Sequence, residues 1–239
     1  MVKQRGYKAD DLFELRTVTD PQISPNGSLI ACSISEIDRE RDTYRSSIWL
    51  YEDGAAPREL TLSGSSNSQP RWSPDGSYLA FLSNRAGGYS QVHILPMNGG
   101  EPIQITDLKG GVSEISWSPD SKSIALTSKV NESVETVSTH DTLPPWIITD
   151  LKYKFNGQGY FDGSKMQLFV VGLDGESPIQ LTEGDYDNSQ ISWSPDCSSL
   201  AFISARHEDR DRDPIEDLWL LTIKDRKIAK LTNGFGNSS

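Results

Sequence analysis

Cysteine is scarce in this chain, and a long apolar run is missing. The 239 residues include two cysteines, Cys32 and Cys197. Cys32 stands where other copies of a repeat described below have Phe or Leu, so we expect it to be a small core residue, and Cys197 falls in a predicted turn. The opening stretch MVKQRGYKADDLFELRTV has basic residues but no apolar run behind them, which is unlike a secretory signal or a membrane span. We therefore expect a cytoplasmic protein without a disulfide.

Positive charge is also in short supply. Lys and Arg number 23 against 34 Asp and Glu, which gives a formal net charge of −11. Nucleic acids and anionic membranes require a basic surface, so neither is expected as the main partner. The negative charge is compatible with attracting cationic groups such as peptide N-termini, although solubility is the simpler explanation.

Signatures of cofactor and metal chemistry are missing as well. The glycine-rich stretches NRAGG and NGQG are not followed by Lys-Ser or Lys-Thr and do not join a strand to a helix, so phosphate binding is not expected. HEDRDRDPIED (207–217) has the closely spaced carboxylates of a calcium loop, but Arg210 and Arg212 alternate with them and neutralise the charge. We interpret it as a solvated loop and expect no metal and no cofactor.

What the chain does have is a repeat. RWSPDGSYLAF (71–81), SWSPDSKSIAL (116–126) and SWSPDCSSLAF (192–202) are near copies, and QISPNGSLIAC (22–32) is a fainter one. A stretch that recurs four times is seldom a catalytic site, because a chain usually needs only one. It marks a repeated structural unit instead.

In each copy Ser-Pro-Asp or Ser-Pro-Asn predicts a tight turn between two strands. Ser suits the first position, Pro presets φ at the second, and the Asp or Asn side chain can accept local backbone N–H groups. The residue that follows needs a left-handed conformation, which Gly27 and Gly76 adopt freely and which should strain Ser121 and Cys197 by about 1 kcal/mol each. The motif therefore closes the first hairpin of each unit and carries no chemistry itself. The tryptophans before it are expected to fill space between units.

The rest of each unit also recurs. A third strand is predicted in SIWLY, QVHIL, MQLFVV and DLWLLT, and a fourth that ends in Leu-Thr or Ile-Thr, at Thr61, Thr106, Thr182 and Thr232. These threonines lie 45, 76 and 50 residues apart, and four short strands in roughly 45 residues are typical of a β-propeller blade. We predict an all-β fold: a partial, open β-propeller of about four four-stranded blades.

The predicted domain boundaries follow from these repeats. An N-terminal arm covers 1–20, where DDLFELRTV predicts a short helix with Asp10 as its N-cap. The partial propeller covers 21–239, and its blades are expected at about 21–62, 69–107, 112–183 and 187–233. Blade three holds an insertion, 130–164, whose aromatic residues either serve function or pack the insertion against the blade.

Three stretches resemble the start of acylaminoacyl-peptidase-type enzymes of the prolyl oligopeptidase family of serine peptidases. They begin with DLFELRTVTDPQISPNGSLIACSISEIDRE, PRWSPDGSYLAFLSNRAGG and ITDLKYKFNGQGYFDGSKMQLFVV, and the resemblance covers about residues 10–234. The resemblance implies a seven- or eight-bladed propeller that caps an α/β-hydrolase domain and admits only short, in some members N-acylated, peptides. The hydrolase domain would carry the nucleophilic serine on a Gly-x-Ser-x-Gly elbow, followed by Asp and His.

This chain departs from the family pattern in its chemistry. It contains no Gly-x-Ser-x-Gly, and its three histidines, His93, His140 and His207, do not follow an alternating α/β stretch. We therefore expect an N-terminal propeller fragment without catalytic residues, whose hydrolase domain is absent. Its expected partners are its own C-terminal hydrolase domain and, through the complete enzyme, short peptides. An open arc is also expected to associate with other copies of itself.

The candidate substrate-gating residues are Arg71, Arg85, Trp146 and Tyr160. Either arginine would meet a substrate carboxylate if it faced the propeller axis, although surface ion pairing is the commoner role. The two aromatic residues belong to the insertion. Glu-Glu, with which dipeptidyl-peptidase relatives hold a free N-terminus, does not occur in the sequence.

Two alternative functions remain open at this point. Four blades can close a ring, so the chain would then be a complete protein-binding module. The Ser-Pro-Asp-Gly motif also occurs in Tol-type periplasmic propellers, against which the missing signal peptide counts.

Overall fold

The structure is a computed structural model that describes residues 6, 8–131, 151–155 and 159–232. Four antiparallel sheets of four strands follow one another along the chain, each in the order of a propeller blade. The all-β prediction is therefore confirmed. The described helical structure is one 3-10 helix, η1 (Ala9–Glu14), and no helix in the described ranges has the length and apolarity to cross a bilayer.

The first two blades are continuous in sequence. Blade one contains β1 (Thr17–Ile23), β2 (Leu29–Asp38), β3 (Thr43–Glu52) and β4 (Arg58–Glu59). Blade two contains β5 (Asn67–Trp72), β6 (Tyr78–Ser83), β7 (Gln91–Pro96) and β8 (Ile103–Gln104). The first strand begins at Thr17, inside the segment assigned above to the arm.

The insertion interrupts blade three between its second and third strands. Blade three contains β9 (Glu114–Trp117), β10 (Ser123–Val130), β13 (Lys165–Gly172) and β14 (Ile179–Gln180), and the insertion adds a small hairpin of β11 (Lys154–Phe155) and β12 (Gly159–Tyr160). Blade four contains β15 (Ser189–Trp193), β16 (Ser199–Ser204), β17 (Asp217–Thr222) and β18 (Lys227–Lys230).

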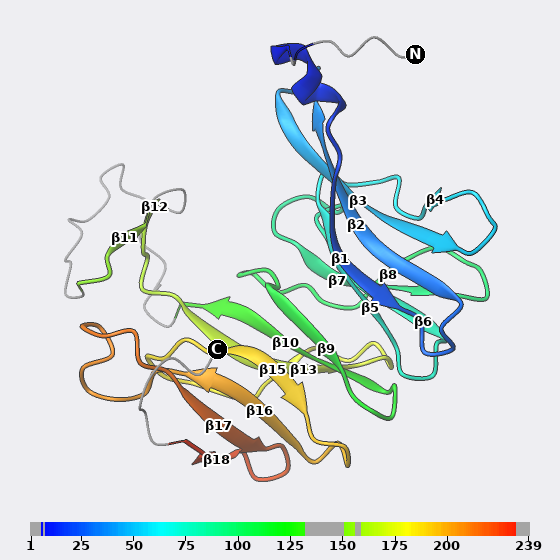
Figure 1. Cartoon of the computed structure of the whole chain (residues 1–239). Helices are drawn as coiled ribbons and strands as arrows, with labels where there is room; N and C mark the ends of the chain where they lie inside the picture. The colour runs from blue at the N-terminus through cyan, green and yellow to red at the C-terminus, as the bar shows by residue number, and fades with distance from the viewer. Residues whose placement is uncertain (1–5, 7, 132–150, 156–158, 233–239) are drawn as a thin grey trace, which may run out of the picture.

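The blades form an open arc (Figure 1). The first strands of successive blades lie against each other, β1 on β5, β5 on β9 and β9 on β15, so they make the inner wall of the arc. Blade four lies at the opposite end of the arc from blade one, and the ring is not closed. This confirms the expected partial propeller.

Helix η1 starts two residues earlier than the sequence suggested. Its N-cap is Lys8, whose backbone N–H donates to the Asp11 carboxylate at 2.8 Å. Asp10 was therefore the wrong cap. It lies inside the helix and forms an exposed ion pair with Arg39 at 3.4 Å.

The Ser-Pro-Asp turns have the predicted chemistry. In blade four the Ser194 hydroxyl donates to the Asp196 carboxylate at 2.6 Å and accepts the Ser199 N–H at 2.9 Å. The Ser198 N–H also donates to Asp196, and these bonds lower the pKa of that carboxyl to about 2. Blades one, two and three repeat the arrangement with Asn26, Asp75 and Asp120.

The left-handed residue after each turn is also as predicted. φ is +61° at Ser121 and +60° at Cys197, beside +75° and +73° at the two glycines of the other copies. Both cysteines have free thiols, and Cys32 is buried.

Cys197→Gly is expected to raise the free energy of unfolding by about 0.5–1 kcal/mol, because glycine adopts positive φ without the steric cost of a Cβ. Urea denaturation of the chain and the variant measures the difference. Gly76→Ala is the matched control and should lower stability by a similar amount, since its new Cβ meets only ordinary contacts. A Cys197→Gly variant that is less stable than the parent would contradict this account.

The fourth strands end earlier than predicted. Each stops one residue before the Leu-Thr or Ile-Thr pair, because the threonine hydroxyl replaces the next backbone acceptor. In blade one the Leu60 N–H donates to the Ile48 carbonyl at 2.8 Å, and the Ile48 N–H then donates to Thr61 Oγ1 at 2.9 Å. The same contact recurs in the other three blades, at Thr106, Thr182 and Thr232.

Tryptophans join consecutive blades, as the repeat predicted. The indole N–H of Trp72 donates to the Gln22 carbonyl at 3.0 Å, that of Trp117 to the Arg71 carbonyl at 2.9 Å, and that of Trp193 to the Ser116 carbonyl at 3.0 Å. Each ring reaches back from the first strand of one blade to the first strand of the blade before it. Apolar clusters fill the space behind these contacts.

Candidate functional site

The inner wall of the arc carries one polar side chain per blade at the same position. These residues stand three places before the aromatic or aliphatic residue that ends each first strand, and we call them the inner-strand row: Asp20, Gln69, Glu114 and Gln190. Three of them adopt left-handed backbone, with φ of +52° at Asp20, +53° at Gln69 and +54° at Gln190. At each of the three the strand register shifts, so the row lies on β-bulges in blades one, two and four.

The row ties each blade to the next. Between blades one and two, Arg71 forms an ion pair with Asp20 at 2.6 Å, both side chains being about three-tenths exposed. Between blades two and three, Gln69 Nε2 donates to the Ser113 carbonyl at 2.7 Å. Between blades three and four, Glu114 makes the corresponding polar contact.

Blade three differs from the other blades at this position, because β9 pairs with β10 without a register shift at Glu114. Its carboxylate accepts the backbone N–H groups of Gln190 at 2.9 Å and Ile191 at 3.0 Å, so it binds the bulge of blade four. Burial raises the pKa of the Glu114 carboxyl, while these two N–H groups and the Arg71 charge act in the opposite direction. Two hydrogen bonds to one carboxylate join the blades at this point and stabilise the wall.

Of the sequence-predicted gating residues, Arg71 lies in this wall. It is on β5, and besides Asp20 its guanidinium donates to the Pro70 carbonyl at 2.8 Å. The arrangement places a paired arginine and two uncharged amide side chains, Gln69 and Gln190, at the inner edge of the blades. Such a wall can contact the backbone or the termini of an extended peptide.

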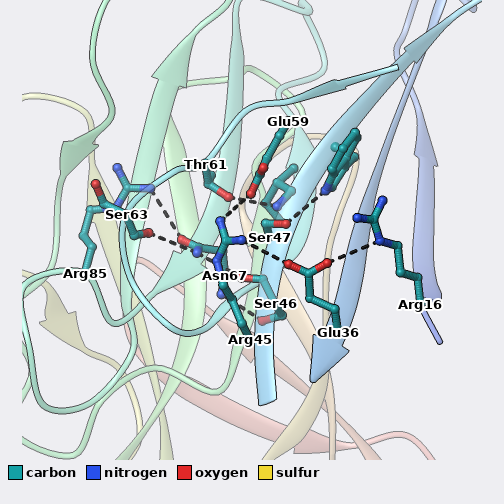
Figure 2. A network of polar contacts seen from close by, with 12 residues as sticks. Arg16, Glu36, Arg45, Ser46, Ser47, Glu59, Thr61, Ser63, Asn67 and Arg85 are labelled. Atoms are coloured by element: carbon teal, nitrogen blue, oxygen red, sulfur yellow. Dashed lines mark hydrogen bonds and ion pairs between the residues drawn. The ribbon is translucent and has the colours of Figure 1, made fainter. Parts of the chain in front are cut away.

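Arg85 lies elsewhere, in the connection that follows β6. Its guanidinium stacks over the Phe81 ring at 5.1 Å, and Nε donates to Ser83 Oγ at 3.1 Å. Figure 2 shows it beside Asn67, whose side-chain amide donates to the Ser46 carbonyl in blade one and to the Ser63 carbonyl in the connection between β4 and β5, both at 3.1 Å. Arg85 therefore supports a polar joint between blades one and two.

Blade four repeats this joint. Arg206 stacks over Phe202 at 5.3 Å, donates to Ser204 Oγ at 3.2 Å and to Asn188 Oδ1 at 2.8 Å. Asn188 in turn donates to the Met166 carbonyl of blade three at 2.7 Å. Burial lowers the pKa of both arginines. Comparing FLSNR (81–85) with FISAR (202–206) would have revealed this pairing in the sequence.

The two aromatic candidates belong to the insertion. Tyr160 is on β12, where its ring stacks on Tyr153 at 6.2 Å and Lys154 Nζ lies 5.0 Å from the ring centre. Trp146 lies outside the described residues. Arg71, Arg85 and Tyr160 thus occupy three different places: the inner wall, a joint between blades, and the insertion hairpin.

The described residues include no group of three or more His, Cys, Asp or Glu side chains arranged to hold a metal ion. The loop at 207–217 connects β16 to β17, as the sequence suggested. Its polar groups bind protein atoms: Arg210 forms an ion pair with Asp185 at 2.6 Å, and His207 Nε2 lies 3.0 Å from the Ile215 carbonyl.

Comparison with known proteins gives three kinds of likeness. The model of the TolB beta propeller domain matches residues 13–146. The uncharacterized peptidase YuxL of Bacillus subtilis (strain 168) is 35% identical over 221 residues, which is 89% of this chain and 33% of that protein. Dipeptidyl-peptidase 5 of Porphyromonas endodontalis is 27% identical over 77% of this chain and 28% of its own length. The chain thus spans about a third of the length of these two relatives.

Among solved structures, the acylaminoacyl peptidase of Pyrococcus horikoshii has the same fold over 93% of this chain and 33% of its own. The TM-score is 0.68 and the sequence identity 19%. At that identity the likeness shows the fold alone.

Proposed function

The chain belongs to the TolB β-propeller domain family, and on that premise we propose that it is the propeller portion of a cytosolic serine oligopeptidase. In this proposal the propeller selects substrates by size, and a C-terminal α/β-hydrolase domain of the same protein cleaves short, in some cases N-acylated, peptides. The identity to a peptidase over 89% of the chain supports the enzyme class. The chain itself contributes no member of the catalytic triad.

The inner wall is the observation that carries size selection. Each of the three junctions between blades is joined at the inner wall by a polar contact, through Arg71, Gln69 or Glu114. Blades tied together in this way resist separating, so in the complete propeller of this proposal the part of the opening that they line keeps a fixed width. A fixed opening admits an extended peptide and excludes a folded protein.

The first experiment determines the natural gene product. We expect an intact mass far above the 26.5 kDa of this chain and a Gly-x-Ser-x-Gly elbow encoded beyond Ser239. Labelling by a serine-reactive fluorophosphonate is expected for the natural protein and not for the 239-residue chain. A natural product that ends at Ser239 would remove the active site from the proposal.

The same protein tests the role of the wall. Glu114→Ala removes the contact that binds blade four to blade three, so the opening can widen. It is expected to raise kcat/KM for a peptide of about thirty residues by roughly tenfold relative to a peptide of five, which corresponds to about 1.4 kcal/mol in activation free energy. The matched control is Glu101→Ala, which removes an acidic side chain from an exposed turn of blade two. An unchanged ratio in the Glu114 variant would refute gating by the wall.

A TolB-like binding module is the second candidate, favoured by the family model itself. This alternative expects a natural protein that is not labelled by the fluorophosphonate and hydrolyses no peptide. Fluorophosphonate labelling and peptide hydrolysis, measured on one preparation of the natural protein, therefore distinguish the two functions.

A further inference from the structure

The loop between β16 and β17 contacts the blade-three insertion through residues about sixty positions apart in sequence. Asp211 accepts two consecutive backbone N–H groups of the insertion, from Leu151 at 2.5 Å and from Lys152 at 3.0 Å, one on each carboxylate oxygen. Lys152 makes the reverse contact, because its ammonium donates to the carbonyls of Arg210 at 2.7 Å and Asp213 at 3.3 Å. Two residues of the insertion thus form four hydrogen bonds with three residues of one loop.

The loop is shaped and anchored independently of the insertion. The N–H groups of Arg212 and Asp213 both donate to the Asp209 carbonyl, at 2.8 and 3.2 Å, which folds the loop into a turn. His207 Nε2 lies 3.0 Å from the Ile215 carbonyl and closes the base of the turn.

A second contact fixes the turn to the body of the protein. Arg210 forms an ion pair with Asp185 at 2.6 Å, and Asp185 also pairs with Lys165, the first residue of β13, at 3.1 Å. The turn is therefore held beside the strand at which the insertion returns to blade three.

We infer that this turn is a latch that holds residues 151–155 of the insertion against blade four, with Asp211 as the acceptor and Lys152 as the tethered cation. The geometry explains the alternation of acidic and basic residues in DRDRD (209–213), which the proposed function does not use. Asp211 binds the insertion, and Arg210 binds Asp185. The carbonyls of Arg210 and Asp213 accept the ammonium.

The latch determines where the hairpin of β11 and β12 lies. Lys152 is followed directly by Tyr153 and Lys154, whose side chains contact Tyr160 across the hairpin. Docking at Lys152 therefore positions Tyr153 and Tyr160 relative to blade four. The latch does not depend on peptidase activity, because the residues that form it all lie in this chain.

The test uses hydrogen exchange of the 239-residue chain, followed by mass spectrometry on peptides that span 151–154. Asp211→Asn retains the size of the side chain but has one acceptor oxygen in place of two, and we expect exchange at these amides to rise at least tenfold. The tryptic cleavage rate after Lys152 should rise in parallel. The melting temperature should change by less than about 2 °C, because these contacts lie at the surface.

The matched control is Asp209→Asn on the same turn, whose carboxylate pairs with Arg212 at 3.6 Å and forms no hydrogen bond with the described residues of the insertion. It should leave exchange at 151–154 unchanged. Lys152→Met should give an intermediate rise, because it removes the ammonium but keeps both amides on Asp211. Unchanged exchange in Asp211→Asn would overturn the latch, and so would an equal rise in both Asn variants, which would show only the effect of loop charge.

Discussion

Replacing Trp117 with alanine is expected to lower the free energy of unfolding by about 3–5 kcal/mol, the usual cost of removing a buried aromatic side chain. Trp117 is 8% exposed, packs in the cluster between blades two and three, and stacks on Tyr78 at 6.4 Å. Its indole N–H also donates to the Arg71 carbonyl. The substitution would leave both a cavity and an unpaired carbonyl at one junction between blades, and urea denaturation would measure the loss.

Two further variants separate packing from hydrogen bonding. Trp117→Phe keeps most of the apolar contact and loses the N–H, so we expect a cost of about 1–2 kcal/mol beyond the small change in volume. Tyr44→Ala removes an aromatic ring that is 73% exposed and should change stability by less than about 0.5 kcal/mol. A Trp117→Ala variant as stable as the Tyr44 variant would show that the tryptophan does not join the blades.

Gly110→Ala should be the second severe substitution, with a cost of about 3 kcal/mol from overpacking. A Cβ at this position would lie 1.9 Å from the carbonyl oxygen of Lys129 and 2.7 Å from its carbonyl carbon. Lys129 is on β10 and pairs with Met166, so its backbone cannot move away without breaking the sheet of blade three. Thermal unfolding followed by circular dichroism would report the loss.

Gly175→Ala, in the turn between β13 and β14, provides the comparison. Gly175 has φ of +85° and open space around its Cβ direction, so the substitution should cost only the left-handed strain of about 1 kcal/mol. If the Gly110 variant lost no more stability than the Gly175 variant, the approach of Lys129 to Gly110 would not be the reason for glycine there.

The sequence was sufficient to predict the features that depend on local chemistry. Ser-Pro-Asp turns form from contacts within five residues, so Ser73 and Asp75 predict their own hydrogen bonds. The recurrence of these turns, with apolar strands on either side, predicted the number of blades. The tryptophans were correctly placed between blades because a large apolar residue at the start of every unit has no other space to fill.

The site depended on contacts that the sequence does not place. Asp20 and Arg71 lie 51 positions apart, and neither pairing partner can be chosen before the blades are arranged. Arg85 was predicted as a candidate for the axis, yet its contacts with Phe81 and Ser83 hold it in the joint beside Asn67. The acidic loop at 207–217 was correctly placed between two strands, but its contact with the insertion depends on Asp211 meeting Lys152 across two blades.

The contact between blades has a consequence for how such a protein can change over evolutionary time. The donor is always the indole of a tryptophan, whereas the acceptor is a backbone carbonyl, supplied by Gln22, Arg71 and Ser116 in turn. Any amino acid at the accepting position offers the same carbonyl. Mutation can therefore alter the side chains at these three positions, and with them the chemistry of the inner edge, without removing the hydrogen bond that each tryptophan makes to the blade before it. A duplicated blade would find its acceptor already present on the blade before it.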